Sequence, residues 1–234
     1  MITINHLNKT FGKVQVLKDI SLDIPHGQTL AILGPNGSGK TTLIKSILGM
    51  VIPDSGNISW NEIPVIRQWK YREMISYLPQ IARFPENLKV KELIQLIRDI
   101  RPGAIREQEL IDLFGLNEFI NKKLGHLSGG TRQKVNLVLT FMYDSPFFIL
   151  DEPTSGLDPV AVIKLKDMLV RERKNGKSVI FTTHILQLVE ELAEKIIFLL
   201  EGNIYFEGSL KELRERTGGK DLEESMAILL TEKS

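Results

Sequence analysis

Short apolar runs, each followed by a stretch with helical periodicity, recur along the chain. This alternation is typical of parallel strands joined by crossover helices. We therefore expect an α/β fold with a mainly parallel sheet at its centre. Strands apolar enough to be buried on both faces of that sheet are predicted at Thr29–Leu33, Phe147–Leu150, Ser178–Thr182 and Ile196–Leu200.

Two other segments alternate apolar and polar residues, which is the pattern of a strand with one exposed face. They are Asp19–Ile24 and Gly56–Trp60. The triplet Glu201-Gly202-Asn203 has the composition of a hairpin turn before a further strand at Ile204–Phe206. We expect these segments to form an antiparallel layer beside the core.

The strand signal disappears between Gln80 and Ser145, where amphipathic helices are predicted instead. We therefore expect a single domain spanning residues 1–234, with an inserted helical subdomain at 81–145 and a C-terminal helical tail at 209–234. In the tail, Ser209 and Glu212 form a capping box, and Gly218-Gly219 interrupts the helical pattern. The expected helices are Lys91–Arg98, Arg106–Phe114 and Thr131–Tyr143 in the insert, and Asp221–Leu230 in the tail.

Composition narrows the classes of function. The chain has 234 residues, 42% of them apolar, and a formal net charge of +1, so it offers no overall field for nucleic acid, and no nucleic-acid partner is expected. Cysteine is absent and the four histidines are scattered, which argues against a thiolate or histidine metal site. No segment has the length of a signal peptide or membrane anchor. If the protein acts at a membrane, another chain must supply the spanning part.

Residues 34–41 read GPNGSGKT and match the phosphate-loop pattern directly after a predicted strand. The glycines let backbone amides turn toward phosphate oxygens, and the following helix presents its positive N-terminus. Lys40 is expected to reach the β and γ phosphates, and the Thr41 hydroxyl to ligate Mg²⁺. The alternative is a solvent turn of small residues. The predicted nucleotide-binding residues here are Gly34, Pro35, Asn36, Gly37, Ser38, Gly39, Lys40, Thr41 and Thr42.

The segment FFILDE at 147–152 predicts a buried strand that delivers two acids at its C-terminal end. That end lies at the same sheet edge as the phosphate loop. We expect Asp151 to hold Mg²⁺ through water and Glu152 to polarise the attacking water as general base. Taken alone, such a pair is more often a helix cap or an exposed turn. The phosphate loop earlier in the chain favours the catalytic interpretation.

Residues 127–131 read LSGGT, and with them the chain resembles the ABC ATPase family, whose hallmark is LSGG. Two glycines leave the backbone bare at a helix N-terminus, where Ser128 and the amides of Gly129, Gly130 and Thr131 can contact a γ-phosphate. The alternative is an ordinary serine N-cap with flexible glycines. Thr131 departs from the glutamine that is usual in the family.

Other motifs follow the order of that family. The resemblance implies that Gln80 in YLPQ senses Mg²⁺ or water and contacts a membrane partner, and that His184 is the switch histidine on the γ-phosphate. It also implies that Phe11 stacks on adenine. Residues of the SGLDP segment would cross a dimer interface: Ser155, Gly156, Leu157 and Asp158. Separately, each has a plainer explanation: a polar loop residue, a surface histidine, a core aromatic and a helix cap.

The family resemblance implies a phosphate-loop NTPase core that binds ATP and Mg²⁺ as a head-to-tail pair of identical copies. Each ATP would lie between the phosphate loop of one copy and the LSGG of the other. Hydrolysis would drive a separate transmembrane permease, and the chain would sit on the cytoplasmic face of the inner membrane.

Two finer resemblances concern the transporter. The stretches ARFPEN (82–87) and SGGTRQKV (128–135) are similar to the ATPase of the copper-processing transporter that helps mature nitrous oxide reductase. The tail DLEESMAILL is similar to ATPases that pair with six-helix ABC-2 permeases. A periplasmic accessory protein, reached through the permease, would then be a further partner.

Three rival classes fit parts of the pattern. A soluble ABC-type ATPase of DNA repair or translation usually carries a coiled-coil insertion or two cassettes, which this chain lacks. A regulatory subunit that binds nucleotide without hydrolysis would not need Glu152 and His184. A phosphate-loop kinase would leave LSGG and SGLDP unexplained.

Overall fold

The computed structural model describes residues 1–66 and 68–231. Its core is a six-stranded sheet in the order β10-β9-β3-β8-β7-β6, in which five strands are parallel and β10 is antiparallel to β9. The four predicted buried strands are confirmed, with ends that differ by at most one residue. The strands are β3 (Thr29–Leu33), β6 (Ile75–Leu78), β7 (Phe147–Asp151), β8 (Ser178–Thr182), β9 (Lys195–Leu200) and β10 (Asn203–Gly208).

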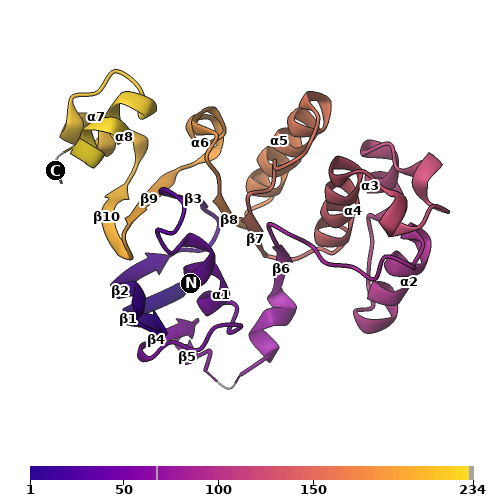
Figure 1. Ribbon diagram of the computed structural model, residues 1–234, viewed down its shortest axis with the longest axis horizontal. Coiled ribbons are helices and arrows are strands. Elements are labelled where there is room, and N and C mark those ends of the chain that lie inside the picture. The colour runs from indigo at the N-terminus through magenta and orange to yellow at the C-terminus, as the bar shows by residue number, and fades with distance from the viewer. Residues whose placement is uncertain (67, 232–234) are drawn as a thin grey trace.

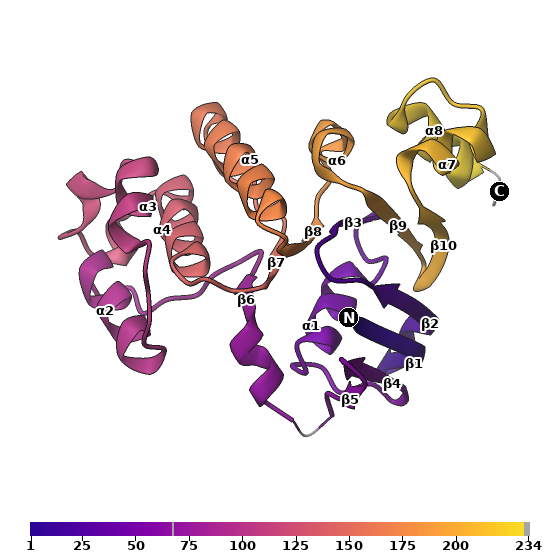
Figure 2. The same ribbon diagram turned by 180° about the vertical axis from the view of Figure 1, so that it is seen from behind.

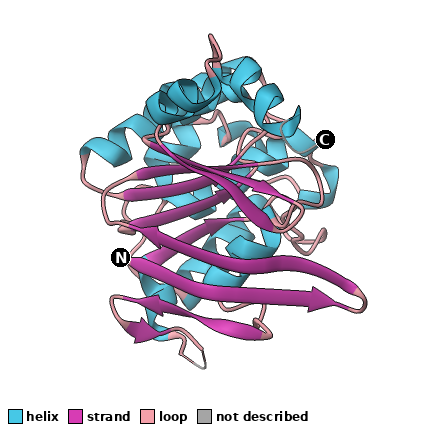
Figure 3. Ribbon diagram, turned by 90° about the vertical axis from the view of Figure 1, so that its left-hand side faces the viewer, coloured by secondary structure: helices cyan, strands magenta, loops and turns pink. Residues whose placement is uncertain are grey.

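A second, antiparallel sheet lies beside the core, as predicted, with the strand order β2-β1-β4-β5. The predicted segments 19–24 and 56–60 belong to β2 and β4, whereas β1 and β5 were not predicted. Figure 3 shows the strands of both sheets together, with most of the helices above them. Bulges interrupt the pairing of β1 with both of its neighbours. The strands are β1 (Ile2–Phe11), β2 (Val14–Ile24), β4 (Ser55–Trp60) and β5 (Ile63–Pro64).

The predicted hairpin at 201–203 forms, but its second strand does not join the antiparallel layer. Because the turn is tight, β10 must return beside β9, and it extends the core sheet instead. Glu201 and Gly202 have φ values of 47° and 83°. A Cβ at Gly202 would lie 2.6 Å from the Val16 carbonyl oxygen, so the turn packs directly on β2.

Three helices are set apart from the others as a group (Figures 1 and 2). This group follows β6 and lies to one side of the core, and we propose that residues 81–145 form the inserted subdomain expected from the sequence. It contains α2 (Val90–Ile100), α3 (Glu107–Leu113), α4 (Gly129–Phe141) and the 3₁₀ turns η2 (Asn117–Phe119) and η3 (Leu124–His126). The remaining helices are distributed around the core: α1 (Lys40–Ile47), α5 (Pro159–Lys174), α6 (Leu186–Leu192), α7 (Leu210–Thr217) and α8 (Leu222–Thr231). A 3₁₀ turn, η1 (Lys70–Met74), precedes β6.

The tail begins with the predicted capping box. The Ser209 Oγ accepts from the backbone N–H of Glu212, and the Glu212 carboxylate accepts from the backbone N–H of Ser209. Gly218 ends α7 in the left-handed conformation at φ 70°. We propose residues 209–234 as a C-terminal helical tail; its last residues, 232–234, lie outside the described part of the chain.

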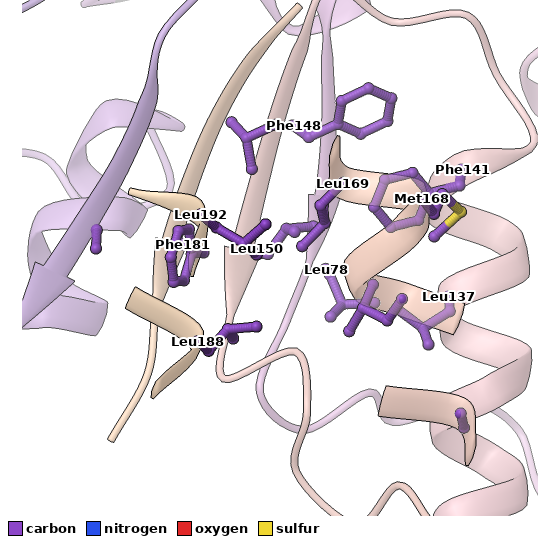
Figure 4. Packing of buried hydrophobic residues seen from close by; sticks show 14 of the residues in the cluster. Leu78, Leu137, Phe141, Phe148, Leu150, Met168, Leu169, Phe181, Leu188 and Leu192 are labelled. Carbon is purple, nitrogen blue, oxygen red and sulfur yellow. The ribbon is translucent and has the colours of Figure 1, made fainter. Parts of the chain in front are cut away.

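Both faces of the core sheet are buried, so packing holds its strands, and the edge formed by their carboxyl ends, in place. Alternate residues of one strand enter two different clusters: Phe148 and Leu150 face α4, α5 and α6, whereas Phe147 and Ile149 face α1 and the antiparallel sheet. Figure 4 shows the first cluster, where the Phe141 and Phe148 rings stack with centroids 4.7 Å apart. Each such large side chain contributes about 1.5–3 kcal/mol on burial. Loops at this edge therefore extend from a rigid support.

Candidate nucleotide-binding site

The carboxyl ends of β3, β7 and β8 bring the predicted chemistry to one edge of the core sheet. The loop 34–39 follows β3, Asp151 ends β7, and the register of β7 and β8 places Asp151 opposite Thr182. His184 follows β8 by two residues. This is the edge at which open α/β sheets bind ligands.

Glycine is required at specific points of the loop 34–39. Gly34, Gly37 and Gly39 all have positive φ, of 144°, 81° and 108°. A Cβ would lie 2.1 Å from the Leu199 carbonyl oxygen at Gly34, but would meet nothing within 4 Å at Gly37. The loop therefore has its back against β9 and an open face opposite.

Lys40 folds over this loop. Its Nζ donates to the carbonyl oxygens of Gly34, at 2.7 Å, and Pro35, at 3.1 Å. Burial lowers the pKa of Lys40, and the nearby carboxylates of Glu152 and Asp151 oppose that shift. Both hydrogen bonds hold the ammonium at the loop, where a phosphate oxygen can replace the carbonyl acceptors.

Asp151 is 2% exposed, and two hydroxyls hold it. Its Oδ2 accepts from the Thr41 Oγ1 at 3.0 Å, and its Oδ1 accepts from the Thr182 Oγ1 at 2.6 Å. The Thr182 Oγ1 also accepts from the backbone N–H of Glu152 at 2.9 Å. Thr182 thus fixes both acids, a role that the sequence interpretation missed because the residue was assigned only as the end of a strand.

Glu152 adopts a positive φ of 51°, which is uncommon for a residue other than glycine. Its side chain reaches His184, whose Nδ1 lies 2.9 Å from the Glu152 Oε2. The Glu152 side chain is 10% exposed, whereas the His184 side chain is 76% exposed. The structure therefore brings the predicted base and the predicted switch histidine into direct contact at the mouth of the site.

A cleft of about 400 Å³ lies over the phosphate loop. Gln80 lines it, but Phe11 does not. Phe11 is 50% exposed and has the Lys9 Nζ 5.3 Å from its ring centroid. The cleft is lined by Val14, Val16, Asn36, Gly37, Ser38, Gly39, Lys40, Thr41, Thr42, Gln80, Asp151 and Glu152. The two valines were not predicted, and nothing short of the packing of β2 beside the loop would have identified them.

The LSGGT residues lie elsewhere. Ser128 is the N-cap of α4, where its Oγ accepts from the Thr131 N–H at 3.2 Å and lies 2.9 Å from the Thr131 Oγ1. Ser128 and Gly129 are exposed. None of the four residues 128–131 lines the cleft over Lys40. The SGLDP segment is exposed too, apart from the half-buried Leu157, and its Asp158 caps α5 by accepting from the Ala161 N–H at 2.9 Å.

The cleft has features that suit phosphate and a divalent ion. The Ser38 Oγ is buried in the loop and has no hydrogen-bond partner, which suits a phosphate oxygen. Thr41 and Asp151 place a hydroxyl and a carboxylate side by side. These are oxygen donors, and Mg²⁺ is usually bound through one or two such side chains together with substrate phosphates. The described residues contain no cluster of three His, Asp or Glu side chains that would hold a metal by itself.

Fold and site together place the chain among phosphate-loop nucleotide-binding proteins, since the loop follows a central parallel strand and faces two acids from another. Comparison with known proteins narrows this class: residues 17–155 match the model of the family described as ABC transporter. The chain belongs to this family as an ATP-binding subunit. It is an ATPase, with ATP as substrate and Mg²⁺ as partner ion.

Relatives and solved structures agree with this assignment. An uncharacterized ABC transporter ATP-binding protein of Bacillus subtilis, YhaQ, is 35% identical over 95% of this chain and 76% of its own length. The lantibiotic transport ATP-binding protein SrtF of Streptococcus pyogenes is 30% identical over 96% and 95%. The solved ATP-binding subunit of an ABC transporter superposes with a TM-score of 0.90 at 29% identity, covering 98% of this chain and 99% of that one.

A dimeric ATP-binding cassette in a post-hydrolysis state, bound to ADP and Pi, is also similar. It has a TM-score of 0.81 at 26% identity and covers 90% of this chain and 99% of its own. Within residues 1–66 and 68–231, no helix combines the length and apolar character that a membrane crossing needs.

Proposed function

We propose that this chain powers a membrane transporter by closing onto a second copy of itself around ATP and reopening after hydrolysis. The observation that carries the proposal is the separation of two phosphate-binding elements. Lys40 and the loop 34–39 line one cleft, whereas Ser128 and Gly129 are exposed at the start of α4 and line no part of it. A head-to-tail pair would use both, because each copy would supply what the other lacks.

Within one site, we assign each side chain the step that its position suits. Lys40 and the loop amides hold the phosphates, and the unpartnered Ser38 hydroxyl adds a donor. Thr41 directly and Asp151 through water would hold Mg²⁺, which would neutralise charge on the phosphates when bound. Gln80, which also lines the cleft, would contact the Mg²⁺ ion or the water that attacks the γ-phosphate.

Glu152 is the general base for the attacking water. His184 contacts the Glu152 carboxylate and is exposed enough to reach a γ-phosphate. In this proposal the contact orients the carboxylate, while Thr182 holds the backbone of Glu152. The exposed Phe11 would contact adenine from outside the cleft walls, beside Val14 and Val16.

A second hollow, of about 530 Å³, supports a place for the permease. Gln80 lines this hollow as well as the nucleotide cleft, and the neighbouring Ile81 is 71% exposed. Arg83, Phe84 and Glu86 also line it. Gly129, Ser155 and Gly156 of the proposed pairing surface line it too, so the permease would use the part next to Gln80 and Ile81. A cytoplasmic segment of the permease seated here would touch the residue that also faces ATP, which would couple transport to hydrolysis.

The finer assignments rest on the sequence resemblance. We propose a six-helix ABC-2 permease as partner and the cytoplasmic face of the inner membrane as location. Copper processing for nitrous oxide reductase, with a periplasmic accessory protein, finds no support in the names of the relatives and stays a prediction from residues 82–87 and 128–135. The printed name of SrtF, a lantibiotic transport ATP-binding protein, makes a lantibiotic the alternative cargo.

The proposal is tested by Glu152→Gln. Removing the base should lower ATP turnover by about a hundredfold or more, while ATP binding persists. The variant should therefore accumulate as an ATP-bound dimer, measured by light scattering with and without Mg-ATP. Glu118→Gln, at an exposed glutamate in η2, is the matched control and should behave as wild type. Wild-type turnover in Glu152→Gln would remove Glu152 from catalysis, and a monomer at saturating ATP would overturn the paired arrangement.

A further inference from the structure

The first turns of α4 lie directly on the loop that links β7 to α5. A Cβ at Gly130 would be 2.5 Å from the Gly156 carbonyl oxygen, so backbone meets backbone there. Four residues later the Lys134 Nζ lies 2.6 Å from the Asp158 Oδ2. Positions separated by three or four residues share one face of a helix. This face of α4 therefore follows the loop that begins directly after Glu152.

Gln133, on the same face, joins α4 to the residue that follows the catalytic base. Its Nε2 donates to the Pro153 carbonyl oxygen at 3.2 Å, and the side chain is 7% exposed. Proline has no N–H, so its carbonyl is the one backbone hydrogen-bonding group that Pro153 offers. A buried amide on α4 thus holds the carbonyl group of the residue that follows Glu152.

One turn later the same arrangement occurs at the other loop of the site. The Asn136 Nδ2 donates to the Pro79 carbonyl oxygen at 3.4 Å, and Asn136 is 3% exposed. Pro79 directly precedes Gln80. Successive turns of α4 therefore hold the residue after Glu152 and the residue before Gln80, each through a buried side-chain amide.

We propose that Gln133 and Asn136 are positioning residues that set Glu152 and Gln80 relative to α4. The inference rests on the proposed head-to-tail pairing. There, the N-terminus of α4 contacts the nucleotide held by the other copy, whereas Glu152 and Gln80 serve the nucleotide of their own copy. The 13 residues of α4 form one continuous helix, so in this proposal a displacement of its N-terminus is carried to Gln133 and Asn136. Occupancy of one site is thereby transmitted to the acid and the amide of the other.

The arrangement has a kinetic consequence. Glu152 reaches its productive position only when α4 is seated on ATP in the opposite site, so each site hydrolyses best when both are filled. The two sites should then show positive cooperativity in turnover. Displacing a catalytic group by about 1 Å can cost a hundredfold in rate, so a small shift of α4 suffices.

Gln133→Met tests this inference, because it keeps the shape of the side chain and removes the donor. We expect kcat to fall roughly tenfold to a hundredfold and the Hill coefficient to approach one. ATP affinity should stay near wild type, since the phosphate loop is not touched, and the thermal midpoint should fall only by what the loss of one buried hydrogen bond costs. Thr140→Val is the control: it removes a bond internal to α4, from the Thr140 Oγ1 to the Asn136 carbonyl oxygen, and should leave kcat and cooperativity unchanged.

Gln133→Glu provides a second measurement. A carboxyl group donates to the Pro153 carbonyl only when it is protonated, so the activity of this variant relative to wild type should rise as pH falls. Unchanged kcat in Gln133→Met would overturn the inference. A parallel fall of kcat, ATP affinity and thermal midpoint would also overturn it, since that pattern marks a purely structural residue. The dimer assay on Glu152→Gln is independent, so failure of the pairing itself would be recognised separately.

Discussion

The two phosphate-binding halves of this chain differ in how complete they are. Around Lys40 and Asp151 the hydrogen bonds are already made: the Lys40 ammonium donates to the carbonyl oxygen of Gly34, Thr41 and Thr182 donate to Asp151, and His184 contacts Glu152. Around Ser128, by contrast, the contacts at the surface are local: the serine bonds Thr131 in its own helix turn. The fold of one copy brings the residues of the first half together, and α4 then adjusts the positions of Glu152 and Gln80 in the inference above. The second half is the N-terminus of α4, which does not line the cleft over Lys40. In the proposed pairing it contacts the nucleotide of the other copy.

Disrupting the exposed half, around Ser128, should have the largest effect on ATP turnover. Ser128→Arg places a long cation where a γ-phosphate of the opposite site is expected. Turnover should fall by about a hundredfold or more, while binding of ATP to the phosphate loop stays near wild type. Isothermal titration of the nucleotide and a phosphate-release assay measure the two quantities. If ATP binding and turnover both stayed at wild-type levels, the two halves would not share a nucleotide.

A gentler change in the same half should have a small effect. Thr131→Gln restores the side chain usual in the family, and the Ser128 Oγ can still accept from the backbone N–H at position 131. We expect turnover to change by no more than roughly threefold, because the serine and the glycine amides supply most of the phosphate contacts. Steady-state ATPase rates measure it. Complete loss of activity would show that the threonine hydroxyl is essential.

The smallest expected effect concerns the link between α4 and the SGLDP segment. The hydrogen bond from Lys134 and then that from the Ala161 N–H hold the pKa of Asp158 below its usual 3.8. A carboxyl with a depressed folded-state pKa contributes stability above pH 3.8, and this is lost as pH falls through the lower folded value. Asp158→Asn keeps the helix cap but removes the charge.

Wild type should therefore exceed Asp158→Asn slightly in stability near neutral pH, and the difference should shrink below pH 3.8. Urea unfolding at a series of pH values measures it. A gap that grew on acidification would contradict the assignment, because it would mean that the carboxylate destabilises the folded state.

Much of this fold could be predicted because its central strands are continuous apolar runs buried on both faces. β3 and β8 match their predicted ends, and the three helices expected before β7 are present. β6 was missed because Ser76 and Tyr77 interrupt its apolar pattern, and only pairing with β7 makes it a strand. Local periodicity cannot report a partner that lies some 70 residues away in the chain.

The residues of the site that belong to sequence motifs could also be predicted. Motifs with fixed spacing identified Lys40, Asp151 and Glu152, which the structure brings together. Thr182 could not be assigned from the sequence, because its role depends on the register that sets it opposite Asp151. Phe11, expected on the adenine, lies outside the walls of the cleft. Inter-strand register and the approach of one sheet to another arise from the whole fold.

The turn at 201–202 shows what this dependence means for any shortened version of the protein. Gly202 donates its N–H to the Ser38 carbonyl oxygen at 3.1 Å and accepts from the Lys18 N–H at 2.7 Å. It thereby braces the phosphate loop and β2 from behind, although residues 201–202 lie beyond the 17–155 segment that carries the family match. A fragment ending before residue 201 would keep Lys40, Ser128, Asp151, Glu152 and His184, yet the wall against which ATP rests would lose its support.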